Sequence, residues 1–338
     1  MEMLEDMPAQ AATGKDRDAP NHEKTAAQID HELAAQIAPS GSVVVSGFWR
    51  SGTTWLQEYL AKLLAAKTIF EPFHFRVPAT KKLFKYYGLA KKSESVRELF
   101  IPYCAEAVLE PHSLLYHYYD SALRANLSGR IVRLLRQGVS ESYRTRVLVK
   151  FTRGQFSLHA AQSTFAMPLI HVYRDPRAVI ASAKMTDWYW LFDELSLPEQ
   201  LLEVQDGRAE FFSRWADEIR AFDHDKISRM AAYWAITERF LCDVFAKRGQ
   251  SRTIFVSYEE LCRDPALVLE ILAKLQVQTA DTGDACAMNG DSFSTSNQRR
   301  GVSSAERISG WQKVLSRAEA ETIASIAKHF GFDERLVE

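Results

Sequence analysis

Residues 42–56 read SVVVSGFWRSGTTWL and contain the strongest indication of the fold. Residues 42–48 form an apolar, valine-rich run, which is typical of a buried β-strand. A glycine-bounded turn follows, and large apolar residues then recur at helical spacing at positions 55, 56, 59, 60, 63 and 64. Strand, glycine turn and helix in this order predict the first unit of an α/β domain.

Three further segments have the character of buried strands: residues 146–151, 169–173 and 253–256. The second is followed by a helical pattern over 177–185, and the third by helical patterns from 259 and over 265–275. Strands that alternate with helices predict an α/β three-layer sandwich, in which a central parallel β-sheet is flanked by helices. Right-handed crossovers would place the carboxyl ends of all strands on one edge, where ligands bind.

The rest of the chain suggests one large domain with a polar arm. Residues 1–25 are poor in large apolar groups, and we expect them to be a disordered arm. We expect a single domain over 26–338, with helical insertions at about 80–142 and 186–250. Their many aromatic residues, WYWLF after Asp187 among them, indicate either core packing or an apolar acceptor pocket and lid. The polar segment 278–298 is expected to be a loop.

Composition excludes several classes of protein. The 338 residues include 42 Lys and Arg against 43 Asp and Glu, and this balance argues against a nucleic-acid binder with a large basic surface. The apolar runs are too short for a membrane span, and the first residues lack a signal-peptide pattern. Four separated cysteines without a CxxC pair fit a reduced compartment. We expect a cytoplasmic protein without nucleic-acid or membrane partners, whose oligomeric state the sequence leaves open.

The turn at residues 47–54, called the phosphate loop below, has the properties of an anion site. Its glycines have the spacing of a Walker A loop, but Thr53 stands where the lysine of ATP-binding loops would be. Backbone N–H groups and the partial positive charge of the following helix would point into the crevice. Arg50 adds a fixed cation, and the hydroxyls of Thr53 and Thr54 can donate to phosphate oxygens. The missing lysine indicates a ligand other than a triphosphate.

A second anion site is expected at the end of the strand over 169–173. Arg174 follows that strand directly, and its planar guanidinium suits a phosphate dianion. Ser182 lies eight residues later, two turns along the next helix, and can face the same crevice. The alternative is a surface turn in which Arg174 pairs with Asp175.

These motifs resemble those of sulfotransferases that use 3′-phosphoadenosine 5′-phosphosulfate (PAPS), which have a P-loop NTPase-like sulfotransferase fold. WRSGTTWL is similar to the family's 5′-phosphosulfate loop, and HVYRDPRAVIAS, residues 171–182, to its 3′-phosphate segment. The resemblance implies that the 5′-phosphate is bound by Arg50, Ser51, Gly52, Thr53 and Thr54. It implies that Arg174 and Ser182 bind the 3′-phosphate, and that Trp55 lies beside the adenine or packs the helix onto the sheet.

Two weaker matches extend the resemblance toward the C-terminus. FVSYEEL, residues 255–261, is similar to a segment near the nucleotide, which implies that Tyr258 contacts the adenine or ribose. Arg299, Arg300 and Gly301, followed by Gly310-Trp311, resemble the family's Arg-Lys-Gly loop and Gly-x-Trp segment. By this resemblance they contact the 3′-phosphate, and which of the two arginines binds stays open.

The resemblance implies transfer of a sulfuryl group from PAPS to a hydroxyl or amine of a small, partly apolar acceptor, with PAP (3′-phosphoadenosine 5′-phosphate) as product and no metal required. In cytosolic members the base is a His two residues after a strand-end Lys. Here Lys150 matches, but Thr152 replaces the His. Carbohydrate-type members use a Glu, often in Phe-Glu-Pro, and residues 70–72 have that sequence.

Glu71 follows a short apolar segment and precedes a proline, so we expect it at a strand-to-loop corner above the crevice. Glu71 is therefore the expected base, with a pKa that burial would raise toward the useful range. His74 is the reserve base, and His117 and His159 follow it. Lys150 and Arg50 would be the cations near the leaving oxygen.

Two other functions remain open at this point. A P-loop nucleotide or small-molecule kinase would turn over ATP with Mg²⁺. A non-catalytic PAP-binding module would keep Arg174 and Ser182 but need no base.

Overall fold

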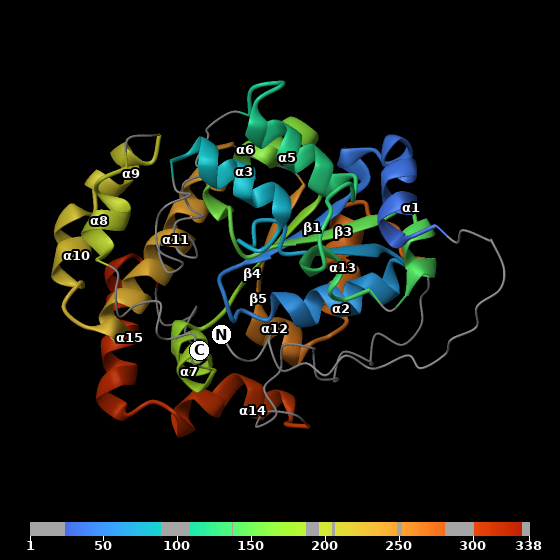
Figure 1. Ribbon diagram of the computed structural model, residues 1–338. Helices are drawn as coiled ribbons and strands as arrows, with labels where there is room; N and C mark the ends of the chain where they lie inside the picture. The colour runs from blue at the N-terminus through green and yellow to red at the C-terminus, as the bar shows by residue number, and fades with distance from the viewer. Residues whose placement is uncertain are drawn as a thin grey trace, which may run out of the picture.

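A computed structural model describes residues 24–88, 109–136, 138–186, 196–204, 207–248, 252–280 and 301–332. Within them lies a five-stranded sheet with the order β2-β3-β1-β4-β5, and every neighbouring pair is parallel (Figure 1). The strands are β1 (Val43–Gly47), β2 (Lys67–Phe70), β3 (Val147–Phe151), β4 (Leu169–Tyr173) and β5 (Thr253–Ser257). The expected parallel α/β sheet is confirmed.

The sheet is buried on both faces because its side chains alternate between two apolar layers. Val43 and Val45 pack with α2 (Thr53–Leu63), α12 (Tyr258–Arg263) and α13 (Leu267–Lys274). Val44 belongs to the larger core on the other face. The helices of that core are α5 (Leu114–Leu123), α6 (Leu158–Phe165), α7 (Pro176–Met185), α11 (Lys226–Arg248) and α15 (Arg317–His329). Figure 1 shows the resulting three layers, with α2 and α13 on one side of the sheet and α5 and α6 on the other.

Shorter helices complete the described parts. The α-helices are α1 (Ala26–Leu33), α3 (Pro78–Tyr86), α8 (Leu197–Leu201), α9 (Ala209–Ser213), α10 (Ala216–Ala221) and α14 (Ser304–Ser309). Single 3₁₀ turns lie at Ala34–Gln36, Pro39–Gly41, Ile131–Arg133, Val139–Tyr143, Gln155–Ser157 and Gly310–Lys313. None of the helices in the described ranges is long and apolar enough to cross a membrane.

Two local expectations differ from the structure. Strand β2 was expected only as a short apolar segment that ends at Glu71, and it was not counted among the strands of the sheet, because its four residues begin with Lys67, whose buried ammonium pairs with Asp30 at 3.3 Å. Residues 124–142 of the expected helical insertion are not α-helical where they are described, but consist of turns, irregular backbone and two short 3₁₀ segments. Arginine side chains there bind backbone carbonyls directly, as Arg136 does with Thr68 O at 3.0 Å.

Some expectations fall outside the described residues. These are the arm up to residue 23, residues 187–195 with the WYWLF cluster, and residues 281–298 of the expected loop. The limits of the single domain stay a prediction.

The parallel sheet places one candidate site residue after nearly every strand, at a common edge. The phosphate loop follows β1, and Glu71 follows β2. Thr152 and Arg153 follow β3, Arg174 follows β4, and Tyr258 follows β5. Strands β1 and β4 are neighbours, yet the chain proceeds from them to opposite sides of the sheet. This is the switch point at which open α/β sheets bind ligands.

Candidate active site

The phosphate loop joins β1 to α2 in a tight turn. Arg50 and Gly52 both have left-handed backbones, with φ of 66° and 86°. Gly52 is required for a second reason, because a Cβ atom there would lie 2.3 Å from the ring of Tyr258. Gly52 caps α2 without a side-chain hydrogen bond, so the first N–H groups of an 11-residue helix start at the loop. Such a helix start favours anions.

The second predicted anion element lies against this loop. The Arg50 side chain donates from Nε to Ser182 Oγ at 2.9 Å, and Arg174 donates from Nη1 to the backbone oxygen of Arg50 at 2.9 Å. Asp175 instead accepts from the backbone N–H of Arg177 at 2.8 Å and pairs with its guanidinium. The structure therefore brings Arg50, Arg174 and Ser182 together, and the alternative Arg174–Asp175 surface pair is not formed.

Tyr258 packs beside the phosphate loop and Arg174. Its ring lies 4.3 Å from the guanidinium carbon of Arg174 and meets the ring of Trp55 edge-on at 5.6 Å. Burial is the main cause that raises the pKa of Tyr258 to about 12, so its hydroxyl is neutral. Trp55 packs between α2 and the sheet, which is the second of the two placements expected for it.

Two buried polar atoms near the phosphate loop make no hydrogen bond to any residue that the structure describes. Ser51 Oγ and Arg174 Nε are buried, and neither makes a hydrogen bond within the described part of the chain, although Arg174 Nε lies 3.9 Å from the buried carboxylate of Glu259. Buried polar groups in folded proteins are normally hydrogen-bonded, so such atoms mark a place for a polar ligand. An unused hydroxyl in the phosphate loop and an unused guanidinium N–H nearby fit a ligand with two phosphate groups.

Glu71 is the centre of a second cluster at the same edge. It follows β2, is 5% exposed, and pairs with Lys150 at 2.9 Å and Arg153 at 3.1 Å. Thr152 donates its hydroxyl to the same carboxylate. Lys150 also donates to Thr54 Oγ1 at 2.8 Å, so this cluster is in direct contact with the phosphate loop. The Lys150 ammonium lies 3.7 Å from the centre of the Phe70 ring.

The expected direction of the Glu71 pKa shift is wrong. Burial alone would raise this pKa, but Lys150, Arg153 and the Thr152 hydroxyl outweigh burial and lower it to about 2. Burial also lowers the pKa of Lys150, and there it exceeds the attraction of Glu71. Glu71 is therefore a carboxylate at neutral pH, and the ion pairs that keep it charged also make it a weak base.

His74 lies close to this cluster, whereas the other histidines belong to other elements. Burial and then Arg153 lower the pKa of His74 to about 3, so its ring is neutral at pH 7 and is a weak base. Its Nδ1 accepts from the backbone N–H of Arg76 at 3.1 Å. His117 lies exposed on α5, and His159 lies buried on α6 near Phe240.

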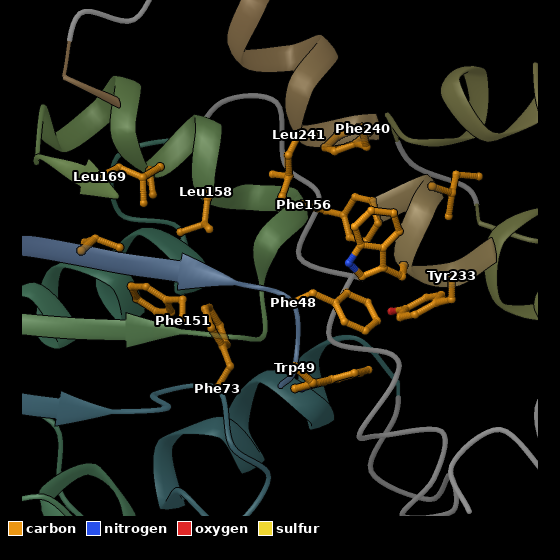
Figure 2. Close-up of a cluster of buried hydrophobic side chains, with 14 of the residues drawn as sticks. Phe48, Trp49, Phe73, Phe151, Phe156, Leu158, Leu169, Tyr233, Phe240 and Leu241 are labelled. Atoms are coloured by element: carbon orange, nitrogen blue, oxygen red, sulfur yellow. The ribbon is translucent and has the colours of Figure 1, made fainter. Parts of the chain in front are cut away.

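A group of buried aromatic rings lies beside Arg153 of this cluster. Phe48 and Trp49 leave the end of β1 and lie against Tyr233 of α11 (Figure 2). Trp49 stacks on Tyr233 with ring centres 6.1 Å apart, and the guanidinium carbon of Arg153 lies 6.0 Å from the Trp49 ring. These buried rings extend from the phosphate loop to the helical part of the chain.

Sequence reasoning missed two participants. Arg153 was not named, although the pairing of Phe70 with Lys150 in the sheet places it beside Glu71. Recognition of β2 as a strand parallel to β3 would have revealed it. Arg307 of α14 was also missed, and its backbone oxygen accepts from Arg174 Nη2 at 2.9 Å. Arg299 and Arg300 lie outside the described residues, while Gly301 is exposed, with φ of 74°.

Comparison with known proteins gives one family match and several distant structural likenesses. The chain matches the model of the Sulfotransferase family over residues 42–281. The sulfotransferase domain from the Synechococcus PCC 7002 olefin synthase is 18% identical, with a TM-score of 0.42, and the match covers 86% of this chain and 94% of that domain. A search of curated proteins found no match.

Two other solved structures are similar at the same level. Sulfotransferase STF1 from Mycobacterium tuberculosis H37Rv is 13% identical, with a TM-score of 0.41, and the match covers 90% of this chain and 81% of that chain. Retinol dehydratase in complex with androsterone and inactive cofactor PAP is 14% identical, with a TM-score of 0.38, and the match covers 91% and 84%. The family match includes all five strands, the phosphate loop and the Arg174–Ser182 segment. The chain therefore belongs to the sulfotransferase family.

Proposed function

We propose that this sulfotransferase transfers the sulfuryl group of PAPS to a hydroxyl or amine of a small, partly apolar acceptor and releases PAP. One observation supports the proposal: Arg174 and Ser182 both bond to Arg50, so the two elements expected to bind anions are in direct contact at the switch point of the sheet. Family membership argues for this reading over a kinase.

The nucleotide would be held at its two phosphorylated ends. The phosphate loop, with the N–H groups at the start of α2 and the unused Ser51 hydroxyl, suits the 5′-phosphosulfate. Arg174 and Ser182 suit the 3′-phosphate, and Arg299, Arg300 and Gly301 remain predicted contacts to it. Tyr258 would pack against the adenosine, and Trp55 supports the Tyr258 ring from α2. No metal is invoked, because these cations and N–H groups can bind the negative charge.

The acceptor oxygen or nitrogen would attack sulfur as the bond between sulfur and the 5′-phosphate oxygen breaks. The electron pair of that bond stays on the phosphate, and the acceptor proton passes to Glu71, which is charged at neutral pH. Lys150 and Arg50 would stabilise the leaving oxygen. Neutral His74 is the second candidate for the base. The rings of Phe48, Trp49 and Tyr233 next to Arg153 support a partly apolar acceptor.

Thermal unfolding with PAP, and separately with ATP and Mg²⁺, tests the proposed nucleotide. A ligand present at a hundred times its Kd stabilises the fold by about 2.7 kcal/mol. We expect this stabilisation with PAP and none with ATP and Mg²⁺, and the reverse result would overturn the proposal.

Arg174→Ala and Ser182→Ala should each reduce the increment that PAP adds to the melting temperature. Arg317→Ala, on an exposed side chain of α15, is the matched control and should leave the increment unchanged.

A further inference from the structure

The two oxygens of Glu71 have different partners. Oε2 accepts from Nη1 of Arg153 at 3.1 Å, whereas Oε1 accepts from the Thr152 hydroxyl and from Lys150 Nζ at 2.9 Å. All of these groups are at most 5% exposed, so water does not screen their interaction. The carboxylate is therefore oriented from both ends by groups of β3 and of the segment that follows it.

Among these partners, Lys150 also contacts the phosphate loop. Its ammonium donates to Thr54 Oγ1 at 2.8 Å while it pairs with Glu71. Thr54 lies in the first turn of α2, the place where the proposed nucleotide carries its 5′-phosphate. An ammonium is a compact point charge on a flexible stem, so a small movement can transfer it from one anion to another. The guanidinium of Arg153 has a planar fork and approaches Glu71 from the opposite end.

We propose that Thr152 and Arg153 are positioning residues that hold Glu71, and that Lys150 is an exchangeable partner which the bound nucleotide draws away from the carboxylate. This inference rests on the proposed function, since it requires a nucleotide phosphate beside Thr54. Before the nucleotide binds, Glu71 is held as a weak base. When it binds, Glu71 loses one of its two cations and becomes more basic, so the base is strengthened when the sulfuryl donor is present.

The inference predicts proton uptake when the nucleotide binds. The charged and titratable groups that face Glu71 are Lys150 and Arg153 from the β3 side and His74 from its own loop. Burial acts to raise the pKa of Glu71, and Lys150 is the first group that opposes it. With Lys150 withdrawn, burial is opposed less, and the pKa rises from about 2. Glu71 therefore binds more protons in the complex than in the free protein, and the difference grows as the pH falls toward the raised pKa.

Isothermal titration calorimetry of PAP binding to the full chain measures this proton uptake, when it is repeated in buffers with different ionisation enthalpies. The titrations cover roughly pH 5 to pH 7, a range above the ordinary pKa of a glutamate side chain. The phosphates of PAP exchange protons in every variant, so the difference between wild type and Glu71→Gln isolates Glu71. We expect greater uptake in wild type, with a difference that increases toward the acidic end.

Lys150→Met tests whether Lys150, and not Thr152 or Arg153, is the partner that the nucleotide withdraws from Glu71. In this variant Arg153 still neutralises Glu71, but the nucleotide has no Lys150 to withdraw, so the extra proton uptake should disappear. Arg153→Lys, which keeps the charge, should retain it. If Glu71→Gln does not fold, the comparison of wild type with Lys150→Met gives the same answer.

Thr152→Val tests the positioning role, because it keeps the shape of the side chain and removes one hydrogen bond to Glu71. We expect kcat to fall roughly ten- to hundredfold, the value of one hydrogen bond to a charged group, while KM for PAPS and the proton uptake stay unchanged. A rise in KM with kcat unchanged contradicts that role.

The failures of the two proposals differ. If wild type binds PAP normally but takes up no more protons than Glu71→Gln, the exchange of Lys150 is wrong and the proposed function stands. If wild type does not bind PAP, the proposed function itself fails.

Discussion

Glu71 combines a buried charge with a strained backbone. Its φ of 44° is left-handed, although it carries a side chain and precedes Pro72. Such a conformation costs about 1–3 kcal/mol and persists only where its surroundings enforce it. Here the His74 N–H donates to the Glu71 carbonyl at 2.9 Å, and two cations hold the carboxylate. Strain of this kind is concentrated at functional sites, which agrees with the proposed role of Glu71 as base.

Replacement of this carboxylate tests that role. Glu71→Gln should abolish turnover without weakening PAP binding, because the amide cannot accept the acceptor's proton and no longer competes with the nucleotide for Lys150. Steady-state assays with radiolabelled PAPS and PAP titration measure the two quantities. Glu321→Gln, on an exposed side chain, is the control. Turnover equal to wild type in Glu71→Gln would move the base to His74.

The phosphate loop shows how one element depends on another that is distant in sequence. Gly52 must be left-handed for the chain to enter α2, and it must lack a Cβ because Tyr258, at the start of α12, lies against it. Tyr258 in turn packs on Trp55 and Arg174, which belong to α2 and to the end of β4. The loop, β4 and α12 therefore form one packed unit, and a change in the loop is transmitted to Arg174.

Two glycine substitutions separate backbone strain from this packing. Gly88→Ala, at φ 73° with open space around it, should cost about 1–2 kcal/mol. Gly52→Ala, at φ 86°, has the same backbone strain and in addition displaces the Tyr258 ring, which adds about 1–3 kcal/mol. Denaturant unfolding measures both. Only Gly52→Ala should weaken PAP binding, and equal losses of stability would show that Tyr258 moves aside freely.

At the scale of the whole molecule, a buried ionic cluster joins the N-terminal helix to the sheet edge opposite the candidate active site. Asp30 of α1 is 1% exposed and pairs with Lys67 at the start of β2, Arg133 and Arg136. Burial lowers the pKa of Lys67 and of Arg136 and exceeds the attraction of Asp30. The single carboxylate of Asp30 thus neutralises Lys67, Arg133 and Arg136, so the stability of the cluster depends on Asp30 more than on any one of the cations.

This asymmetry makes a prediction about stability. Asp30→Asn leaves buried cations without their anion and should cost about 3–5 kcal/mol. Lys67→Met should change stability by no more than about 1–2 kcal/mol, because Asp30 keeps both arginines and an apolar side chain fills the space. Chemical denaturation at neutral pH measures both. Equal losses in the two variants would contradict a cluster that depends on its anion.

Local pattern was sufficient for the fold class and for finding the two elements that we propose bind phosphate. Strands β1, β3, β4 and β5 consist of short apolar runs, and the glycine spacing and RDP motif of the two anion elements lie within single segments, so neighbouring residues carry the information. The nature of the Glu71 site could not be obtained in this way. Thr152 lies 81 residues from Glu71 and Arg153 lies 82 residues from it, and only the parallel pairing of β2 with β3 brings them together. The pKa of a buried group depends on the sum of burial and nearby charges, so its direction follows from which cations the fold places beside it.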